Sequence, residues 1–197
     1  RIIGDVHGKR REYLKIVQGC NYSVQLGDMD FEYSWLPDYR YHRFLGGNHD
    51  NYFLYSDTPQ ALGHHRAVNM NGVPFFFIRG AYSIDRRVRT VNVDFFHEEE
   101  LDHYQLHYLV NQVRNLSVKP DIILTHDAPS FLYEPLGIKD GWFSITSQVL
   151  SIVWENLKPK LWLFGHHHKS WSDNIEGTHF RCLTELEYVD INSQGEI

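Results

Sequence analysis

The sequence predicts an α/β fold in which short buried strands end at polar, glycine-containing turns. Apolar runs stop abruptly beside glycine at several points, as at Gly27-Asp28 and Gly46-Gly47-Asn48. Stretches with helical apolar spacing lie between some of these runs, and Asn71-Gly72 between two apolar runs predicts a β-hairpin. Ligands of open α/β sheets bind at the carboxyl ends of strands, so these polar turns mark the expected site.

The first half of the chain alternates strand, helix, strand, loop and strand. The predicted strands are residues 2–3, 22–26 and 41–45, each followed by a polar turn. Residues 8–17 predict a helix, because Tyr13, Leu14 and Val17 recur at helical spacing. Residues 30–40 are rich in aromatic side chains but show neither helical nor strand periodicity, which predicts a loop.

The second half predicts two hairpins, two helices and further buried strands. The hairpins are expected at residues 65–78 and 171–183, each around a turn that contains glycine. The helices are expected at residues 97–116 and 144–157. Buried strands are expected at 122–124 and 161–164, with a last strand at 188–191. Residues 85–96 and 127–143 predict loops, and the longer one is expected to shape a pocket.

Composition favours one globular domain and limits its partners. The chain has 197 residues, a net charge of −6 and a pI near 6.1, which argues against a broad nucleic-acid footprint. A small anionic substrate is compatible with this charge, since a bound metal ion can make the local charge of a site positive. Two cysteines form no disulfide framework, so a reducing, cytoplasmic location is expected. No apolar run reaches the ~18 residues of a membrane span, so no membrane partner is expected.

Oxygen and imidazole donors recur where the apolar runs end. Seven such side chains are Asp5, His7, Asp28, Asn48, His126, His166 and His168. Asp5 and His7, two apart across a turn, can chelate one ion, and Asp28 is the natural bridge to a second. Carboxylate, imidazole and amide donors without thiolate suit two divalent ions such as Mn, Fe or Zn, with Mn²⁺ the choice for assays in vitro. Two such ions clamp a phosphoryl group.

The order of these donors resembles the calcineurin-like metallophosphoesterase superfamily. Its pattern is D-x-H, G-D, G-N-H-[D/E], a single His after a strand, and G-H-x-H, and all five blocks occur here between Asp5 and His168. The resemblance implies one metallophosphoesterase domain over residues 1–197, a four-layer α/β/β/α sandwich with two mixed β-sheets flanked by helices. It also implies hydrolysis of phosphate esters by attack of metal-bound hydroxide on phosphorus, without a covalent enzyme intermediate.

The resemblance also assigns roles to individual side chains. It places the first metal on Asp5, His7, Asp28 and His168. It places the second on Asp28, Asn48, His126 and His166. His49 would protonate the leaving oxygen and stabilise the charge on the phosphoryl group. His167 is outside this set, and the i, i+4 pair His103 and His107 is expected on a helix surface.

Two features depart from the phosphoprotein phosphatases, whose first block Gly4-Asp5-Val6-His7-Gly8 resembles. That branch continues its second block as G-D-x-x-D-R-G, whereas here the arginine is absent, and so is the carboxylate at the third position after Asp28. Asp30 and Asp50 are therefore the candidates to orient His49. The segment 80–85 is similar to one in small bacterial and phage members. A solvated basic loop is the favoured interpretation of the arginines that follow it, with a phosphate grip as the alternative: Arg86, Arg87 and Arg89.

The substrate class stays open between two kinds of ester. The first block favours phosphomonoesters, such as a phosphorylated small molecule or a phosphopeptide, and the missing arginine favours phosphodiesters. A non-catalytic scaffold has the same fold in the superfamily but lacks the catalytic histidine, whereas Asn48 and His49 are both present here. A nuclease ranks lower because the chain is short and acidic.

Overall fold

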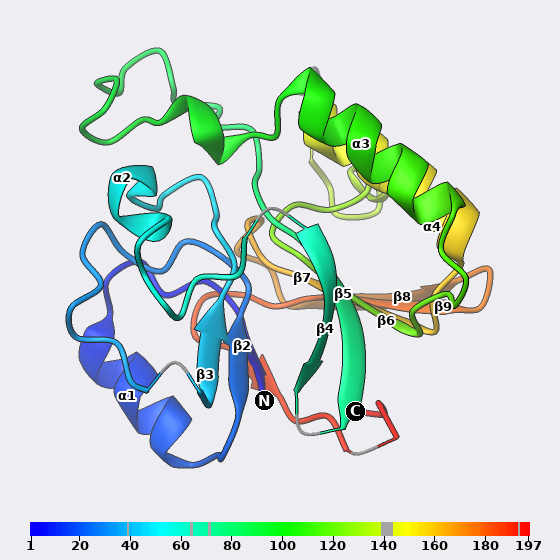
Figure 1. The fold of residues 1–197 in the computed structure, drawn as a ribbon, viewed down its shortest axis with the longest axis horizontal. Coiled ribbons are helices and arrows are strands. Elements are labelled where there is room, and N and C mark those ends of the chain that lie inside the picture. The colour runs from blue at the N-terminus through cyan, green and yellow to red at the C-terminus, as the bar shows by residue number, and fades with distance from the viewer. Residues whose placement is uncertain (39, 64, 71, 139–143, 193) are drawn as a thin grey trace.

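Two β-sheets face each other and helices cover their outer faces (Figure 1). The computed structural model describes residues 1–38, 40–63, 65–70, 72–138, 144–192 and 194–197. The smaller sheet has the strand order β10-β1-β2-β3 and the larger one β4-β5-β6-β7-β9-β8. The α/β prediction is confirmed, and both sheets are mixed, as the resemblance implied.

The smaller sheet carries the first half of the chain. Its strands are β1 (Ile2–Ile3), β2 (Ser23–Gln25), β3 (His42–Phe44) and β10 (Tyr188–Val189). β1, β2 and β3 are parallel, while β10 runs antiparallel to β1 with Ile2 opposite Val189. Helix α1 (Arg10–Gln18) makes the crossover from β1 to β2 and buries Tyr13 and Val17.

The larger sheet has a parallel centre and antiparallel edges. Its strands are β4 (His65–Met70), β5 (Val73–Ile78), β6 (Ile122–Thr125), β7 (Leu161–Phe164), β8 (Trp171–Ile175) and β9 (Thr178–Cys182). β5, β6, β7 and β9 are parallel, and the hairpin partners β4 and β8 form the edges. The crossovers contain α3 (His103–Arg114) and α4 (Ile145–Leu157).

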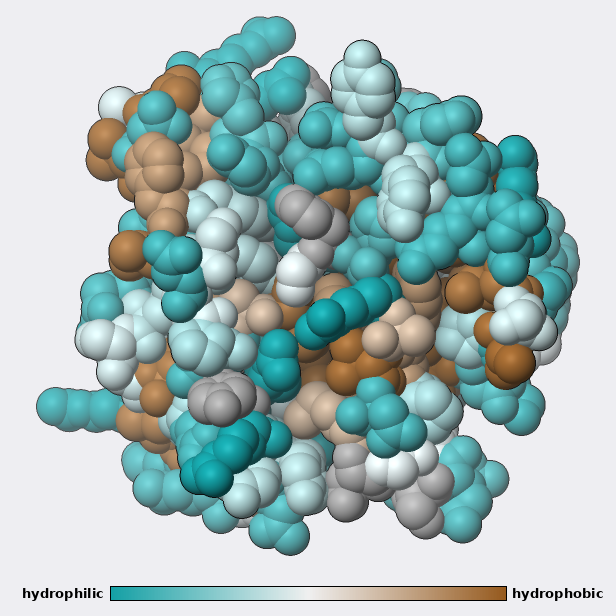
Figure 2. Space-filling view, in the orientation of Figure 1, coloured by the Kyte–Doolittle hydropathy of each residue, from teal (hydrophilic) through white to brown (hydrophobic). Residues whose placement is uncertain are grey.

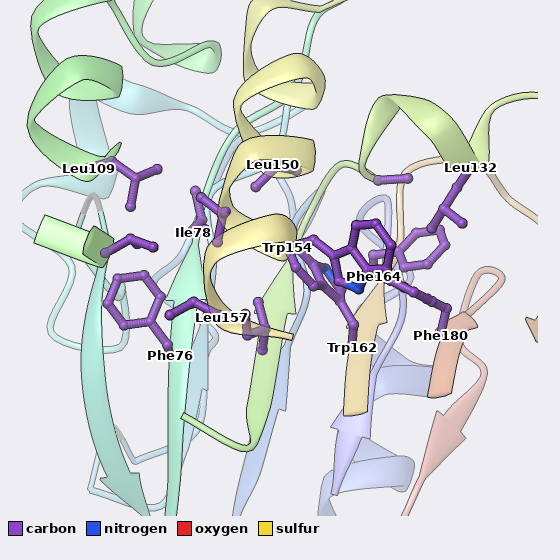
Figure 3. Packing of buried hydrophobic residues seen from close by; sticks show 14 of the residues in the cluster. Phe76, Ile78, Leu109, Leu132, Leu150, Trp154, Leu157, Trp162, Phe164 and Phe180 are labelled. Carbon is purple, nitrogen blue, oxygen red and sulfur yellow. The ribbon is translucent and has the colours of Figure 1, made fainter. Parts of the chain in front are cut away.

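Period-two alternation along the strands builds the layers. Phe75 and Phe77 of β5 pack between the two sheets, whereas Phe76 and Ile78 pack under α3 and α4. Figure 3 shows the second set beneath α4 beside Leu150 and other apolar side chains of that helix. A third apolar cluster lies between the smaller sheet and α1. Three apolar interfaces therefore separate four layers, which is the α/β/β/α arrangement.

The structure corrects the boundaries of several predicted elements. The helix expected at 97–116 is two elements, a 3₁₀ turn η1 (His97–Glu99) and α3, because Asp102 caps α3 with an extended backbone. A short helix α2 (Tyr52–Tyr55) and a 3₁₀ turn η2 (Ser130–Leu132) were not predicted. The predicted turn residue Asn71, residue 39 and residues 139–143 of the predicted loops lie outside the described part of the chain.

Hydrophilic side chains cover most of the face in Figure 2, with separate hydrophobic patches between them. Within the described residues, no helix has the length and apolar character needed to cross a membrane.

Candidate metal centre

The predicted donors meet where strands of both sheets end. Asp5 follows β1, Asp28 follows β2 and Asn48 follows β3, while His126 and His166 follow β6 and β7 of the other sheet. Parallel strands end at the same edge of a sheet, so the topology brings together donors as far apart in sequence as Asp5 and His166.

Four donors form what we call the outer ligand group: Asp5, His7, Asp28 and His168. Their ligand atoms all lie within 4.8 Å of one another. His168 Nε2 is 3.2 Å from Asp5 Oδ2, and His7 Nε2 is 3.7 Å from Asp28 Oδ2 and 2.9 Å from His168 Nε2. Two imidazole nitrogens that converge on two carboxylates form a set of donors suited to one divalent ion.

Four donors form the inner ligand group: Asp28, Asn48, His126 and His166. The ligand atoms of Asp28, His126 and His166 again lie within 4.8 Å of one another. His126 Nε2 is 3.0 Å from Asn48 Oδ1 and 3.3 Å from Asp28 Oδ1. Asp28 is common to both groups, which is the position that a bridging carboxylate requires.

His126 is held ready to use Nε2 as a ligand. Its Nδ1–H donates to the carbonyl oxygen of Leu26 at 2.8 Å, so Nε2 points at the oxygens of Asn48 and Asp28. Burial disfavours the imidazolium, but the charge and hydrogen bond of Asp28 outweigh it and raise the pKa of His126 to about 10. Without metal a proton therefore occupies the place between nitrogen and oxygens that a divalent cation would take.

His166 has the opposite character. Burial, together with the neighbouring His167, lowers the pKa of His166 to about 3. Its ring centroid lies 4.9 Å from that of His126. The ring is therefore neutral at pH 7 and has a nitrogen lone pair for an ion.

Four of the donor residues have a left-handed backbone. The φ angles are 47° at His7, 58° at Asp28, 65° at His166 and 50° at His168. Non-glycine residues rarely adopt this conformation, although Asp and His tolerate it better than most, and it clusters at functional sites. The chain therefore keeps an unfavourable backbone at the positions where the donors converge.

Two glycines allow the backbone to approach the donors. A Cβ atom on Gly47 would overlap the Asp28 carboxylate, and one on Gly165 would overlap the Asp5 carboxylate. Gly47 of the G-N-H-D block therefore leaves room for the carboxylate of Asp28, and Gly165 of the G-H-x-H block leaves room for that of Asp5.

Asp50 and Asp30 take partners other than the His49 ring. Buried Asp50 accepts hydrogen bonds from backbone N–H groups of residues 28, 29, 30 and 47 and from the Tyr33 hydroxyl at 3.0 Å. Burial and the nearby Asp28 raise the pKa of Asp50 to about 7. Asp30 instead accepts from Arg10 Nε at 2.8 Å. The two carboxylates organise turns around the centre. The expectation was that one of them orients the His49 ring, but their contacts are with Arg10, Tyr33 and backbone N–H groups.

His49 stands at the rim of a cleft of about 600 Å³ over the donors. Its backbone N–H donates to Asp28 Oδ1 at 2.7 Å, and its ring centroid is 5.5 Å from that of His7. Burial lowers the pKa of His49 against the opposing effect of the Asp28 charge. The cleft is lined by donors and by apolar and aromatic residues: Asp28, Asn48, His49, Tyr82, Ile84, Asp85, Tyr133, Ile138, His166, His167 and His168.

The three arginines after Gly80 divide into two kinds. Arg86 and Arg87 are exposed, as the favoured interpretation predicted, and Arg86 lies 4.2 Å above the Tyr82 ring. Arg89 is wrongly assigned to the solvated loop, because its side chain is only 6% exposed and is paired with Glu99. Among the described residues, no arginine or lysine lines the cleft. His103 and His107 are exposed on α3, as predicted.

A histidine–carboxylate pair was missed by sequence reasoning. His167 Nε2 lies 3.2 Å from Asp127 Oδ1, and the buried Asp127 also accepts from Ser144 Oγ at 2.6 Å and from the Tyr133 hydroxyl. Burial opposes ionisation of Asp127, but these partners lower its pKa. The third histidine in the run 166–168 and the Asp directly after His126 are the sequence features that could have indicated this pair.

Comparison with known proteins decides the family. A family model described as calcineurin-like phosphoesterase matches residues 1–170. The chain belongs to this family. A lariat debranching enzyme from Entamoeba histolytica is 27% identical over 220 residues, which cover 94% of this chain and 59% of that relative. This calcineurin-like phosphoesterase chain thus spans 59% of the length of the curated relative it matches.

A solved structure supports the fold of this phosphoesterase. The phosphopantetheinyl hydrolase of Mycobacterium tuberculosis superposes with a TM-score of 0.53 at 11% identity, covering 93% of this chain and 88% of the other. At this identity the likeness concerns the fold alone. Family membership and the two donor groups together fit a dimetal centre of the kind typical of calcineurin-like phosphoesterases.

Proposed function

We propose that the chain hydrolyses phosphodiesters at a centre of two divalent ions. The outer ligand group would hold one ion and the inner ligand group the other, and the observation that carries the proposal is that Asp28 belongs to both groups. Two bound ions supply a nucleophile near neutral pH and neutralise charge on the phosphoryl group. The chain's own part is to fix the donors and to shape the cleft above them.

His49 is the side chain proposed to act on the leaving oxygen. It lines the cleft beside Asp28 and Asn48, and its backbone is fixed by the hydrogen bond to Asp28. Burial favours the neutral ring in the free protein, and the negative charge of a bound ester would raise its pKa toward the protonated form. From there the ring can donate its proton to the leaving oxygen and stabilise the charge that develops.

The cleft wall favours a diester over a monoester. A monoester dianion has an additional charged oxygen, which a basic side chain pairs with well, and no arginine or lysine lines the cleft among the residues described. Tyr82, Ile84 and Ile138 instead offer apolar surface to a second organic group. The relative that is a lariat debranching enzyme supports the same choice.

The test compares two nitrophenyl esters in the presence of Mn²⁺. Wild type is expected to hydrolyse bis-p-nitrophenyl phosphate faster than p-nitrophenyl phosphate, and only with metal. His49→Ala is expected to lower kcat on bis-p-nitrophenyl phosphate because charge stabilisation by the ring is lost. The loss should be larger, about 100-fold or more, on a dialkyl phosphodiester, whose alkoxide leaving group also needs the proton of a general acid. Mn²⁺ binding, measured by titration calorimetry, should persist in that variant. His103→Ala, which removes an exposed histidine on α3, is the matched control and should retain full activity.

Each outcome bears on a separate part of the proposal. Full activity of His49→Ala would contradict the role of His49. A preference for the monoester would contradict the diester. Failure of the wild type to bind Mn²⁺, Zn²⁺ or Fe²⁺ would contradict the dimetal centre.

A further inference from the structure

The segment between β5 and η1 forms one wall of the cleft. It contributes Tyr82, Ile84 and Asp85 to the lining. In Figure 1 this green segment extends beside α2, away from both sheets. Residues 84–96 consist of turns and irregular backbone without a regular helix or strand. Backbone N–H groups of Gly80 and Ala81 bond to the carbonyls of Gly46 and Glu99 at the base of this wall, and side-chain contacts there add to them.

A buried polar cluster closes the base of that segment. Arg89 Nη2 lies 2.7 Å from Glu99 Oε1, and the two side chains are 6% and 2% exposed. Ser83 Oγ accepts from Arg89 Nη1 at 2.7 Å and donates to Glu99 Oε2 at 2.6 Å. The carbonyl of Asp94 also accepts from Arg89. One guanidinium thus joins both ends of the segment.

The same guanidinium reaches the turn that carries two proposed site residues. Arg89 Nη2 donates to the backbone carbonyl of Asn48 at 2.9 Å. The side chain of Asn48 belongs to the inner ligand group, and the next residue is His49. This turn is held from within by the Asp28 and Asp50 carboxylates, and Arg89 holds it from the side of the cleft wall.

Stability alone does not explain why the Arg89–Glu99 ion pair is buried. A buried ion pair often contributes little net stability compared with apolar side chains of similar size, because both charges lose water. Arginine, however, offers five donors in a fixed planar fork, so one side chain can join several acceptors at defined angles. The Arg89 guanidinium donates to groups in three separate parts of the chain: the Asn48 carbonyl, the Ser83 hydroxyl and the Glu99 carboxylate.

We propose that Arg89, backed by Glu99, is a positioning residue that fixes the Asn48–His49 turn relative to the cleft wall. The proposal rests on the proposed function, since it gives Asn48 and His49 their roles in that reaction. A shift of the Asn48 backbone would move its side-chain amide and, through the peptide bond, the His49 ring together. Arg89 therefore acts on both the inner metal position and the leaving group without touching either.

The experiment compares Arg89→Ala with Arg87→Ala, which removes an exposed arginine of the same loop. Both are assayed below their melting temperatures after circular dichroism has shown the same folded content as wild type. Arg89→Ala is expected to weaken Mn²⁺ binding and lower kcat on bis-p-nitrophenyl phosphate, each by about 10- to 100-fold, as loss of a supporting contact to a metal ligand does. The KM should change less than kcat. Arg87→Ala should stay within about twofold of wild type.

Two further measurements separate positioning from mere stability. Guanidinium added at low concentration should restore part of kcat in Arg89→Ala, because it can occupy the vacated place, whereas it should not affect Arg87→Ala. Arg89→Lys, which keeps the charge but not the fork, should fall between wild type and Arg89→Ala.

The outcomes distinguish this role from the proposed function. Wild-type metal affinity in a folded Arg89→Ala would overturn the positioning role alone. An equal loss in Arg87→Ala would also overturn it, since net charge would then explain the effect. A wild-type chain that binds no metal would overturn the dimetal function and this role with it.

Discussion

The outer and inner ligand groups share Asp28 but differ in their surroundings. In the outer group the side chain of His168 is 53% exposed and that of His7 is 24% exposed. In the inner group His126 is fully buried and Asn48 is 4% exposed. The outer histidines sit on turns that reach solvent, while His126 follows a central strand and is locked by the Leu26 carbonyl. The two proposed metal positions are therefore expected to exchange their ions at different rates, the outer one first.

Removal of the shared carboxylate should have the largest effect, because it damages both positions at once. Asp28→Asn is expected to lose both metals and at least about 100-fold in kcat, since even indirect partners of ligands are worth 10- to 100-fold. Metal content of the purified variant, measured by mass spectrometry, checks this. Retention of one full metal equivalent would contradict the bridging position of Asp28.

The next largest effect should distinguish the two groups directly. His126→Ala is expected to lose the inner ion and to destabilise the fold, because the buried Asn48 Oδ1 loses its hydrogen bond to His126 and the buried Asp28 carboxylate loses a neighbouring imidazole. His168→Ala is expected to weaken only the outer ion, by about tenfold or more, with little change in melting temperature, since the side chain is largely exposed. Melting curves and metal titrations of the two variants check the contrast. Equal melting temperatures would contradict the difference in burial as its cause.

A further contrast concerns the pH dependence of the stability of the metal-free chain. The pKa of His126 is raised from 6.5 to about 10, so its contribution to stability is complete below pH 6.5 and is lost as pH rises through about 10. The melting temperature should fall over this window by about 2–4 °C for each kcal/mol lost. Affinity for Mn²⁺ at the inner position should rise over the same window, because the ion displaces that proton.

The control for the pH dependence is His126→Gln, which lacks the titrating group. Its melting temperature should be flatter between pH 6.5 and 10 than that of wild type. An equally steep fall in this variant would assign the pH dependence to other groups. The pKa of His168 is raised mainly by its hydrogen bond to Asp5, so the Mn²⁺ affinity of the outer position should also rise as pH rises.

The sequence predicted the fold and the convergence of the donors because both depend on local patterns. Apolar runs that end at glycine place a donor at a strand end, and parallel pairing then brings the ends together, as for Asp28 and His126. The helix expected at 97–116 failed where Asp102 offers a cap that competes with helix continuation. The pattern of apolar positions does not register such a break, since Leu101 before it and Leu106 after it are both buried.

Side-chain partners across the fold were less predictable. A cluster of arginines is usually a solvated surface, and nothing local marks Arg89 as the one that meets Glu99 ten residues later. The motif makes Asp30 and Asp50 the candidates to orient His49, yet the path of the backbone gives them Arg10 and backbone N–H groups as partners. Such pairings are set by tertiary packing, which one sequence does not reveal.

The left-handed ligand turns constrain how this centre can be altered or transplanted. His7, Asp28, His166 and His168 must each supply a donor atom and also accept a backbone that costs about 1–3 kcal/mol for a non-glycine residue. Glycine would relieve the backbone but has no donor, and a longer carboxylate or a β-branched side chain would meet neither demand well. A design that grafts only the ligand side chains onto another α/β scaffold would leave out the left-handed backbone that positions them. The transferable unit is the whole turn, with its glycine beside the donor, and natural variation is expected to exchange these turns as units.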